Sequence, residues 1–400
     1  MSPYRGTTAL SRWGYRRGLA VDAALVNGAD RMRSTDGRAT LAYWWLVAVS
    51  AVIVLAALVC VGVAAWLWVA TDLPVGVRLV FTLALLALAW FLAPRVGSAP
   101  KVGRLADGQG PEFRRLVADV AAAVGAPPPD IIVFDMGLNA GVARVGWRGQ
   151  SVLALGAPLW TILTPAARIS LLAHEFGHLV NGDPMRRRAT LPARTFGARA
   201  VAATGGRNPW SRAFATAETA AWHGGDRAGL AGLLIGGTMA AVNTAGATVQ
   251  LLVDAVAMPD SRRAELRADL KAIEVGGTAA FVESEDYLLM ADGIYQDLWD
   301  RAPRIGPEDL PDAIRQSAEL HGRELDVLRQ ASVRHTDLWS SHPSSRDRIR
   351  VAESTSPVQA TLQVPSDRWS AIDSEMSAWS AHIHKTLLGT RDRISATGSR

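Results

Sequence analysis

Two long apolar segments near the N-terminus dominate the pattern of hydrophobic and polar positions. Residues 41–70 form thirty consecutive positions without a charged side chain. About 20 apolar residues of helix cross a bilayer core, so this segment can span it with tilt or overhang. The second segment, 73–93, is interrupted only by Arg78 near its start, where an arginine can extend to the interface. The pattern predicts a transmembrane hairpin at 41–94, because thirty uncharged residues are long for a buried core helix.

The flanking charges predict the orientation of this hairpin. Seven arginines precede residue 41, whereas the connection between the two apolar segments offers only Asp72 and Arg78. Basic residues remain on the cytoplasmic side of a membrane. We therefore expect a cytoplasmic basic tail at 1–40 and a cytoplasmic location for everything after Pro94, in a multi-pass protein of the cell membrane. A cleaved signal peptide is not expected, because the apolar segment starts late and is too long.

Beyond residue 100 the pattern changes to that of a folded domain. Apolar residues at helical spacing predict a helix at 111–124, and the prolines at 127–129 end it. Short apolar runs at 131–134, 139–145 and 151–155 predict strands. A helix is predicted at 165–179, with Thr164 as its N-cap and a stop at 181–184. Further helices are predicted at 260–275, 311–331 and 366–388. The expected fold class is mostly α with a small β-sheet (α+β).

Composition excludes several classes of protein. Hydrophobic residues make up 49% of the 400 positions and charged residues 20%, which excludes a disordered chain. Cys60 is the only cysteine, so a disulfide scaffold and a cysteine metal cluster are excluded. The net charge is +5, but the arginines are scattered, and we expect no nucleic-acid partner.

The helix at 165–179 contains the sequence His-Glu-Phe-Gly-His at 174–178. Two histidines four residues apart project from one helix face, so His174 and His178 can converge on one cation. Zinc accepts neutral imidazole and retains an open position for water. Glu175 is adjacent to the first histidine and can act on that water as a general base. The alternative, two unrelated surface histidines, is disfavoured by the apolar residues that precede the motif.

A second helix offers the carboxylate that a catalytic zinc site needs. Glu265 and Asp269 are four residues apart and share one face of the predicted helix at 260–275. This spacing lets Glu265 bind the metal while Asp269 orients a ligating histidine. The segment alone also fits an ordinary solvated helix face, and only its combination with the upstream motif favours a metal site.

These motifs resemble those of the HtpX-like membrane zinc metalloproteases, relatives of the CAAX prenyl endopeptidases. The resemblance rests on the motif at 174–178 followed by Asn-Gly-Asp at 181–183, and on Ser-Arg-Arg at 261–263 ahead of Glu265 and Asp269. Upstream, Asn139 and a strand resemble the substrate-side strand of the family; the strand residues are Val152, Leu153, Ala154 and Leu155. His342-Pro343 and Arg348 resemble its C-terminal signature.

The resemblance implies a zincin-like metallopeptidase domain at 101–353, followed by a C-terminal helical extension at 354–400. It implies one zinc ion per chain, bound by His174, His178 and Glu265, with Glu175 as the general base. Asp269 would support a ligand. His342 or Arg348 would lie near the oxyanion, and His335 is a competing candidate for that place.

The chain departs from the family between the two metal helices, where relatives often have two further membrane spans. Here one apolar stretch, 228–253, follows an arginine-rich segment at 185–227 that makes a poor span. Because His178 and Glu265 must meet at one zinc, an even number of crossings must separate them. The stretch 228–253 is too short to cross twice as helix. Packing without crossing is therefore the favoured interpretation, and pairing with a degenerate span near 189–206 is the alternative.

The sequence thus predicts a membrane-anchored zinc endopeptidase that hydrolyses peptide bonds in membrane-associated or misfolded proteins. Its expected partners are a protein or peptide substrate and the lipid bilayer, and the pattern predicts no oligomeric state. The rival hypothesis is a catalytically silent membrane scaffold or binding protein that retains a metal site. The intact Glu175 argues against it, because a structural site has no need of a base. A transporter fits less well, because neither clear span holds an ionisable cluster.

Overall fold

The structure, a computed structural model, describes residues 16–21, 23–24, 40–135, 137–203, 230–332, 343–354, 356–377, 384–385 and 388–389, with only the backbone at 230–239. The chain divides into two compact units. The sheet unit comprises the described parts of Met1–Gly37, Val96–Met185 and Ser261–Arg400. The apolar unit comprises those of Arg38–Arg95 and Arg186–Asp260. The predicted class, mostly helical with a small sheet, is confirmed.

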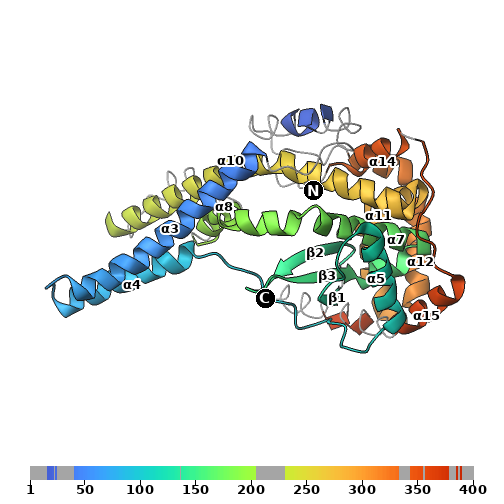
Figure 1. Cartoon of the computed structure of the whole chain (residues 1–400), viewed down its shortest axis with the longest axis horizontal. Helices are drawn as coiled ribbons and strands as arrows, with labels where there is room; N and C mark the ends of the chain where they lie inside the picture. Colours follow the sequence, from blue (N-terminus) through green and yellow to red (C-terminus); the bar gives the residue numbers. More distant parts are fainter. Residues whose placement is uncertain are drawn as a thin grey trace. The chain divides into compact units, whose positions relative to one another are not determined.

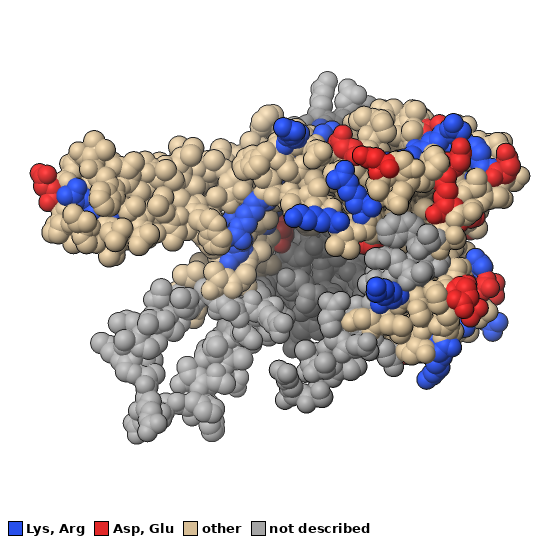
Figure 2. Space-filling model, turned by 90° about the horizontal axis from the view of Figure 1, so that it is seen from below, with Lys and Arg blue, Asp and Glu red and all other residues tan. Residues whose placement is uncertain are grey.

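Helices α3 (Leu41–Val69) and α4 (Val75–Leu92) of the apolar unit pack against each other (Figure 1). Their other surfaces are covered with exposed large apolar side chains, such as Leu55 at 60% and Trp90 at 68%. Figure 2 shows this surface almost free of charged groups except near its end. Exposed apolar area of this extent is unfavourable in water and favourable in lipid. Both helices are long and apolar enough to cross a membrane, which confirms the two predicted segments as candidate spans.

A third candidate span lies in α10 (Leu230–Gly276), over Ala240–Gly276. Within the apolar unit α10 packs closely against α8 (Asp183–Ala203). A Cβ added at Gly197 would lie 2.4 Å from the carbonyl oxygen of Gly246, so the two backbones touch. Arg199 of α8 donates to the carbonyl oxygens of Phe91 and Ala93, both at 2.8 Å, and so caps the end of α4. The pairing of α8 with α10 is the arrangement that the alternative interpretation of 228–253 requires.

The sheet unit contains three strands in the order β1–β3–β2. β1 (Ile131–Asp135) runs parallel to β3 (Gln150–Gly156), and β2 (Ala140–Val145) runs antiparallel to it. The amide of Gly156 donates to the carbonyl of Asn139. In an antiparallel ladder, successive residues of a strand direct their backbone N–H and C=O groups alternately toward and away from the partner strand. Since those of Asn139 point toward β3, those of 140, 142 and 144 point away from it. β2 is therefore an edge strand, and β3 is paired on both sides.

The hydrophobic core lies between this sheet and three helices, α5 (Pro111–Val124), α6 (Ala157–Ile162) and α7 (Pro165–Val180). Three aromatic rings form its centre. Phe113 of α5 contacts Phe134 of β1 with ring centroids 5.3 Å apart, and Trp160 of α6 at 5.1 Å. Figure 1 shows α5 and α7 beside the sheet. This core fixes α7, which carries the predicted metal motif, on a rigid platform.

The remaining helices of the sheet unit are α11 (Thr278–Arg301), η1 (Ala302–Arg304), α12 (Leu310–Gly322), α13 (Leu325–Ser332), α14 (Ser345–Glu353) and α15 (Ser366–Met376). The single helix predicted at 311–331 is wrong, because the chain turns between α12 and α13 at Arg323 and Glu324. α11 was not predicted. The helix predicted to begin at 366 does so, and α15 ends at Met376.

Helix α15, which belongs to the sheet unit, packs onto α5 and α7 through specific polar contacts. Glu375 of α15 accepts from the backbone amides of Glu112 and Phe113, which are unpaired donors at the start of α5. Asp373 pairs with the buried Arg168 of α7 at 2.6 Å. The guanidinium of Arg168 also lies over the ring of Trp369. Helix α15 therefore braces the N-terminal ends of both α5 and α7.

Candidate metal centre

Local signals define the two ends of α7. The Thr164 side chain accepts from the amide of Ala167, and Pro165 occupies the first helical position, where it has no amide to leave unpaired. After α7, Gly182 takes a φ of +73°, a left-handed conformation that favours glycine. The predicted N-cap and stop are thus both present, and the chain reverses directly into Asp183.

Two glycines bring α7 against the last turns of α10. A Cβ at Gly177 would lie 3.0 Å from the Cα of Ala268, and a Cβ at Gly276 would lie 2.9 Å from the Cα of Ser170. Gly177, near the end of α7, thus contacts Ala268, whereas Ser170, earlier in α7, contacts Gly276 at the end of α10. The two helices therefore run antiparallel in close contact. This contact sets the face of α7 that bears the histidines opposite the face of α10 that bears Glu265.

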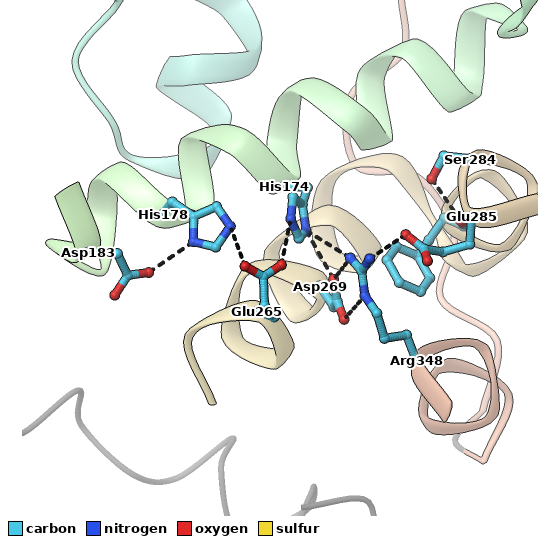
Figure 3. Close-up of polar contacts among 9 residues, drawn as sticks. His174, His178, Asp183, Glu265, Asp269, Ser284, Glu285 and Arg348 are labelled. Carbon is cyan, nitrogen blue, oxygen red and sulfur yellow. Dashed lines mark hydrogen bonds and ion pairs between the residues drawn. The ribbon is translucent and has the colours of Figure 1, made fainter. Parts of the chain in front are cut away.

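The imidazoles of His174 and His178 converge on one carboxylate (Figure 3). Nε2 of His174 lies 3.5 Å from Oε2 of Glu265, and Nε2 of His178 lies 3.6 Å from its Oε1. One potential ligand atom from each residue lies within 4.8 Å of the other two. The structure therefore gathers the three predicted zinc ligands, from two helices about 90 residues apart in sequence, at one point.

The other nitrogen of each histidine is held by a carboxylate. Nδ1 of His174 lies 3.0 Å from Asp269, and Nδ1 of His178 lies 3.0 Å from Asp183. A carboxylate at Nδ1 fixes the proton there and leaves the Nε2 lone pair available for a metal. The predicted orienting role suits the position of Asp269. No role was predicted for Asp183, although its place just after the Gly182 turn could have suggested one.

Arg348 of α14 lies behind His174, on the side of Nδ1. Its guanidinium pairs with both oxygens of Asp269, contacts Glu285 of α11 at 2.8 Å, and lies 3.4 Å from Nδ1 of His174. All of these groups are buried. Burial lowers the pKa of Arg348, but Asp269 and Glu285 outweigh it and raise the pKa. Asp269 and Glu285 thus pair with the guanidinium, which lies on the side of His174 away from Glu265. Glu285 was not predicted as part of the site, because no sequence pattern predicted α11.

The donor set fits a tetrahedral zinc ion. Ligand atoms bound to zinc at ~2.1 Å in a tetrahedron lie ~3.4 Å apart. The two nitrogens lie 3.5 and 3.6 Å from different oxygens of Glu265, and one ligand atom from each residue lies within 4.8 Å of the other two, so the three side chains would draw slightly closer around a zinc ion. Burial lowers the pKa of His174, but its bonds to Asp269 and Glu265 outweigh this and raise the pKa to about 10. A positive charge is therefore stabilised at this position. Figure 3 draws four carboxyl groups, of which Asp269 and Glu285 pair with Arg348, and a divalent cation beside Glu265 would add positive charge next to its carboxylate.

The structure describes only some of the other residues that the sequence predicted for the site. Glu175 is buried at 7% exposure within α7. His342 and His335 lie outside the described residues. Asn139 is exposed immediately before β2. The expected docking of a substrate beside 152–155 has to be corrected, because β3 is the central strand and both of its edges are already paired.

The packing of Arg348 generates a test of its role. Arg348→Met removes the cationic partner of the buried Glu285 and one of the two partners of Asp269, and it should lower the free energy of unfolding by ~3–5 kcal/mol. It should also weaken zinc binding by about 10–100-fold, because Asp269 no longer holds His174 in place. Chemical denaturation and zinc titration measure the two effects. Arg350→Met, at an exposed position of the same helix, is the matched control. A variant Arg348→Met that lost only turnover would place this arginine at the oxyanion instead.

Comparison with known proteins agrees with this site. Residues 108–356, more than half of the chain, match peptidase family M48, and this range contains both metal helices. A 111-residue segment is 28% identical to a protein described as "Protease HtpX homolog" from Syntrophobacter fumaroxidans, over 27% of this chain and 39% of that protein. The chain thus aligns with well under half of that relative's length. No solved structure matches the chain significantly. The chain belongs to peptidase family M48, within which it is similar to the HtpX-like membrane metalloproteases.

Proposed function

We propose that this protein is a membrane-anchored zinc endopeptidase with its active site on the cytoplasmic face. The observation that carries the proposal is the convergence of two imidazole Nε2 atoms on Glu265, while carboxylates hold both Nδ1 atoms. One zinc ion per chain would be bound by His174, His178 and Glu265. Zinc supplies Lewis acidity, which polarises a scissile carbonyl and lowers the pKa of a water toward 7.

The protein's own groups would supply the proton transfers and the alignment. Glu175 would accept the proton of the attacking water on its carboxylate and pass it to the nitrogen of the leaving amine. Asp183 and Asp269 would keep the imidazoles in the required tautomer. Arg348 would act as a positioning residue by holding Asp269 against His174.

The open edge of β2 would bind the substrate as an added strand. α7 packs against β2, so this edge runs beside the metal helix. On the far side of the sheet, β1 already bonds to 103–105, because Phe134 donates to Gly103 and Leu105 donates to Ile132. Among the described residues, no such backbone bond reaches 140, 142 or 144. An extended peptide would pair there by main-chain hydrogen bonds.

The membrane helices restrict which substrates reach this edge. Candidate spans α3 and α4 immediately precede residues 96–185 of the sheet unit in the chain, so the chain would tether the active site to one bilayer. Membrane-associated proteins, including misfolded ones, are the substrates that this tether favours. Positive residues ahead of α3 support the cytoplasmic orientation.

Glu175→Gln separates metal binding from catalysis. Glutamine keeps the shape of the side chain but cannot accept a proton, so proteolysis of casein should fall by about 10²–10⁴-fold. Zinc content should remain near one per chain, measured by elemental analysis. Glu319→Gln, at an exposed position of α12, should change neither. Near-normal proteolysis by Glu175→Gln would refute the role of Glu175 as general base. A wild-type protein that contains one zinc ion per chain but shows no proteolysis would favour the scaffold hypothesis.

Val142→Pro tests the proposed substrate edge. Proline removes one outward amide and is tolerated in an edge strand, so the loss of a substrate hydrogen bond should lower kcat/KM for a peptide by about 10-fold. Val142→Ala removes most of the same side chain but keeps the amide, and it is the control. Zinc content should be equal in the two variants. If both variants cleave the peptide equally well, the substrate does not pair at this position.

A further inference from the structure

The N-terminal segment contacts the helix that carries the predicted third zinc ligand. Residues 16–21 are helical, and within them Gly18 is buried whereas Ala20 is exposed. The guanidinium of Arg262, in α10, donates through one Nη to the carbonyl oxygen of Gly18 at 3.0 Å. The two residues are 244 positions apart in sequence and belong to the same compact unit. The contact therefore folds the start of the chain back onto the sheet unit.

The burial of Arg262 makes this contact a specific one. Its side chain is fully buried, with 0% exposure, which is rare for an arginine unless partners hold it. A buried guanidinium is costly unless its N–H groups are bonded. The carbonyl of Gly18 is one of the acceptors that meet this requirement. The N-terminal segment thus supplies part of the hydrogen bonding that Arg262 needs in order to be buried.

Arg262 lies close to Glu265 on the same side of α10. Three residues of helix separate the two Cα atoms by about 4.5 Å along the axis and by about 60° around it. Both side chains are buried, Glu265 with 7% exposure. A displacement of the helix at Arg262 would therefore displace the carboxylate that faces the two histidines.

This part of α10 needs support from outside the helix. Pro259 lies inside α10, just ahead of Arg262. A proline lacks the amide that would bond to the carbonyl four residues earlier, and its ring clashes with that carbonyl, which weakens or kinks a helix. Downstream, Ala268 packs against Gly177 of α7, where a Cβ would lie 3.0 Å from the Cα of Ala268. Glu265 thus lies between two contacts, one with the N-terminal segment and one with α7.

We propose that the N-terminal segment at Gly18 is a positioning element of the metal centre. It holds Arg262, and through Arg262 it fixes the turn of α10 from which Glu265 reaches the zinc ion. The segment lies outside residues 108–356, so the match to the peptidase family does not include it. Because Gly18 precedes α3, the contact also requires the N-terminal segment and the metal centre to lie on the same side of the membrane. The inference rests on the proposed zinc site and is independent of proteolysis.

Gly18→Leu tests the contact on the full-length protein. A leucine side chain at this buried position would push the segment away from Arg262, so zinc should bind about 10-fold more weakly in a titration of the apo protein. Ala20→Leu, at an exposed position of the same segment, is the matched control and should bind zinc as the wild type does. The Tm of each apo protein is measured in parallel. If Gly18→Leu binds zinc normally, with or without a lower Tm, the contact is purely structural and the proposal is overturned.

Arg262→Lys breaks the same contact from the other side, and it decides the test if Gly18→Leu does not fold. Lysine keeps the buried positive charge but loses the planar fork of donors, so zinc should again bind about 10-fold more weakly. Arg263→Lys, at an exposed position of the same helix, is the control. The double variant of Gly18→Leu and Arg262→Lys should bind zinc no more weakly than the weaker single variant, because both remove one contact. Additive losses, or unchanged zinc affinity in Arg262→Lys, would contradict the proposal.

The two proposals fail in different ways, because none of these measurements needs turnover. A wild-type protein that binds no zinc would refute the proposed metal site itself. Zinc binding that is equally tight in the wild type, Gly18→Leu and Arg262→Lys would leave that site intact and refute only the positioning role of the N-terminal segment.

Discussion

The close antiparallel contact between α7 and the last turns of α10 is the constraint on which the metal centre depends. At Gly177 and at Gly276 the backbones approach so closely that a Cβ would meet main-chain carbon of the other helix at 3.0 and 2.9 Å. A larger side chain at either position would push the helices apart. Since zinc ligands tolerate displacements of only a few tenths of an ångström, such a separation would remove Glu265 from the histidines. Helix packing therefore explains why a glycine stands at position 177 inside the metal motif.

A second consequence of this contact is a continuous row of charged groups. From Asp183 through the two histidines and Glu265 to Asp269, each group touches one of opposite or complementary character, and Arg348 and Glu285 complete the row. Most of these side chains are buried, so a missing member leaves an uncompensated neighbour. The row connects α7, the first residue of α8, α10, α11 and α14, and the metal centre is thereby tied to the folding of the sheet unit.

The strongest sequence signals gave the most accurate predictions. Helical periodicity located α5 and α7, and short apolar runs located the three strands, all to within a residue or two; the uncharged segments located α3 and α4. The spacing of His174, His178, Glu265 and Asp269 predicted a cluster that the structure brings together. These features are local, or depend on one helical turn, and that information is present in a single sequence.

What the sequence could not supply depends on contacts between distant elements. The strand order that leaves β2 rather than β3 at the edge is a property of pairing, which no strand determines alone. Glu285 lies in a helix without a clear pattern, and only its contact with Arg348 identifies it. Arg348 itself was expected near the oxyanion, but its orientation depends on how α14 packs. The packing of α15 likewise depends on contacts between distant elements, because Asp373 pairs with Arg168 of α7 and Glu375 accepts from the amide of Glu112 in α5.

Zinc affinity in two glutamate variants tests the central claim most directly. Glu265 and Glu274 lie on the same helix, and Glu274 is exposed and paired with Lys271 at 2.7 Å, away from the histidines. Titration of the apo protein with zinc should show one site per chain in the wild type. Glu265→Gln should weaken zinc binding by at least about 100-fold, because it removes a metal ligand. Glu274→Gln should bind zinc as the wild type does. If the two variants bind zinc equally well, the third ligand lies elsewhere and the account of the metal centre is wrong.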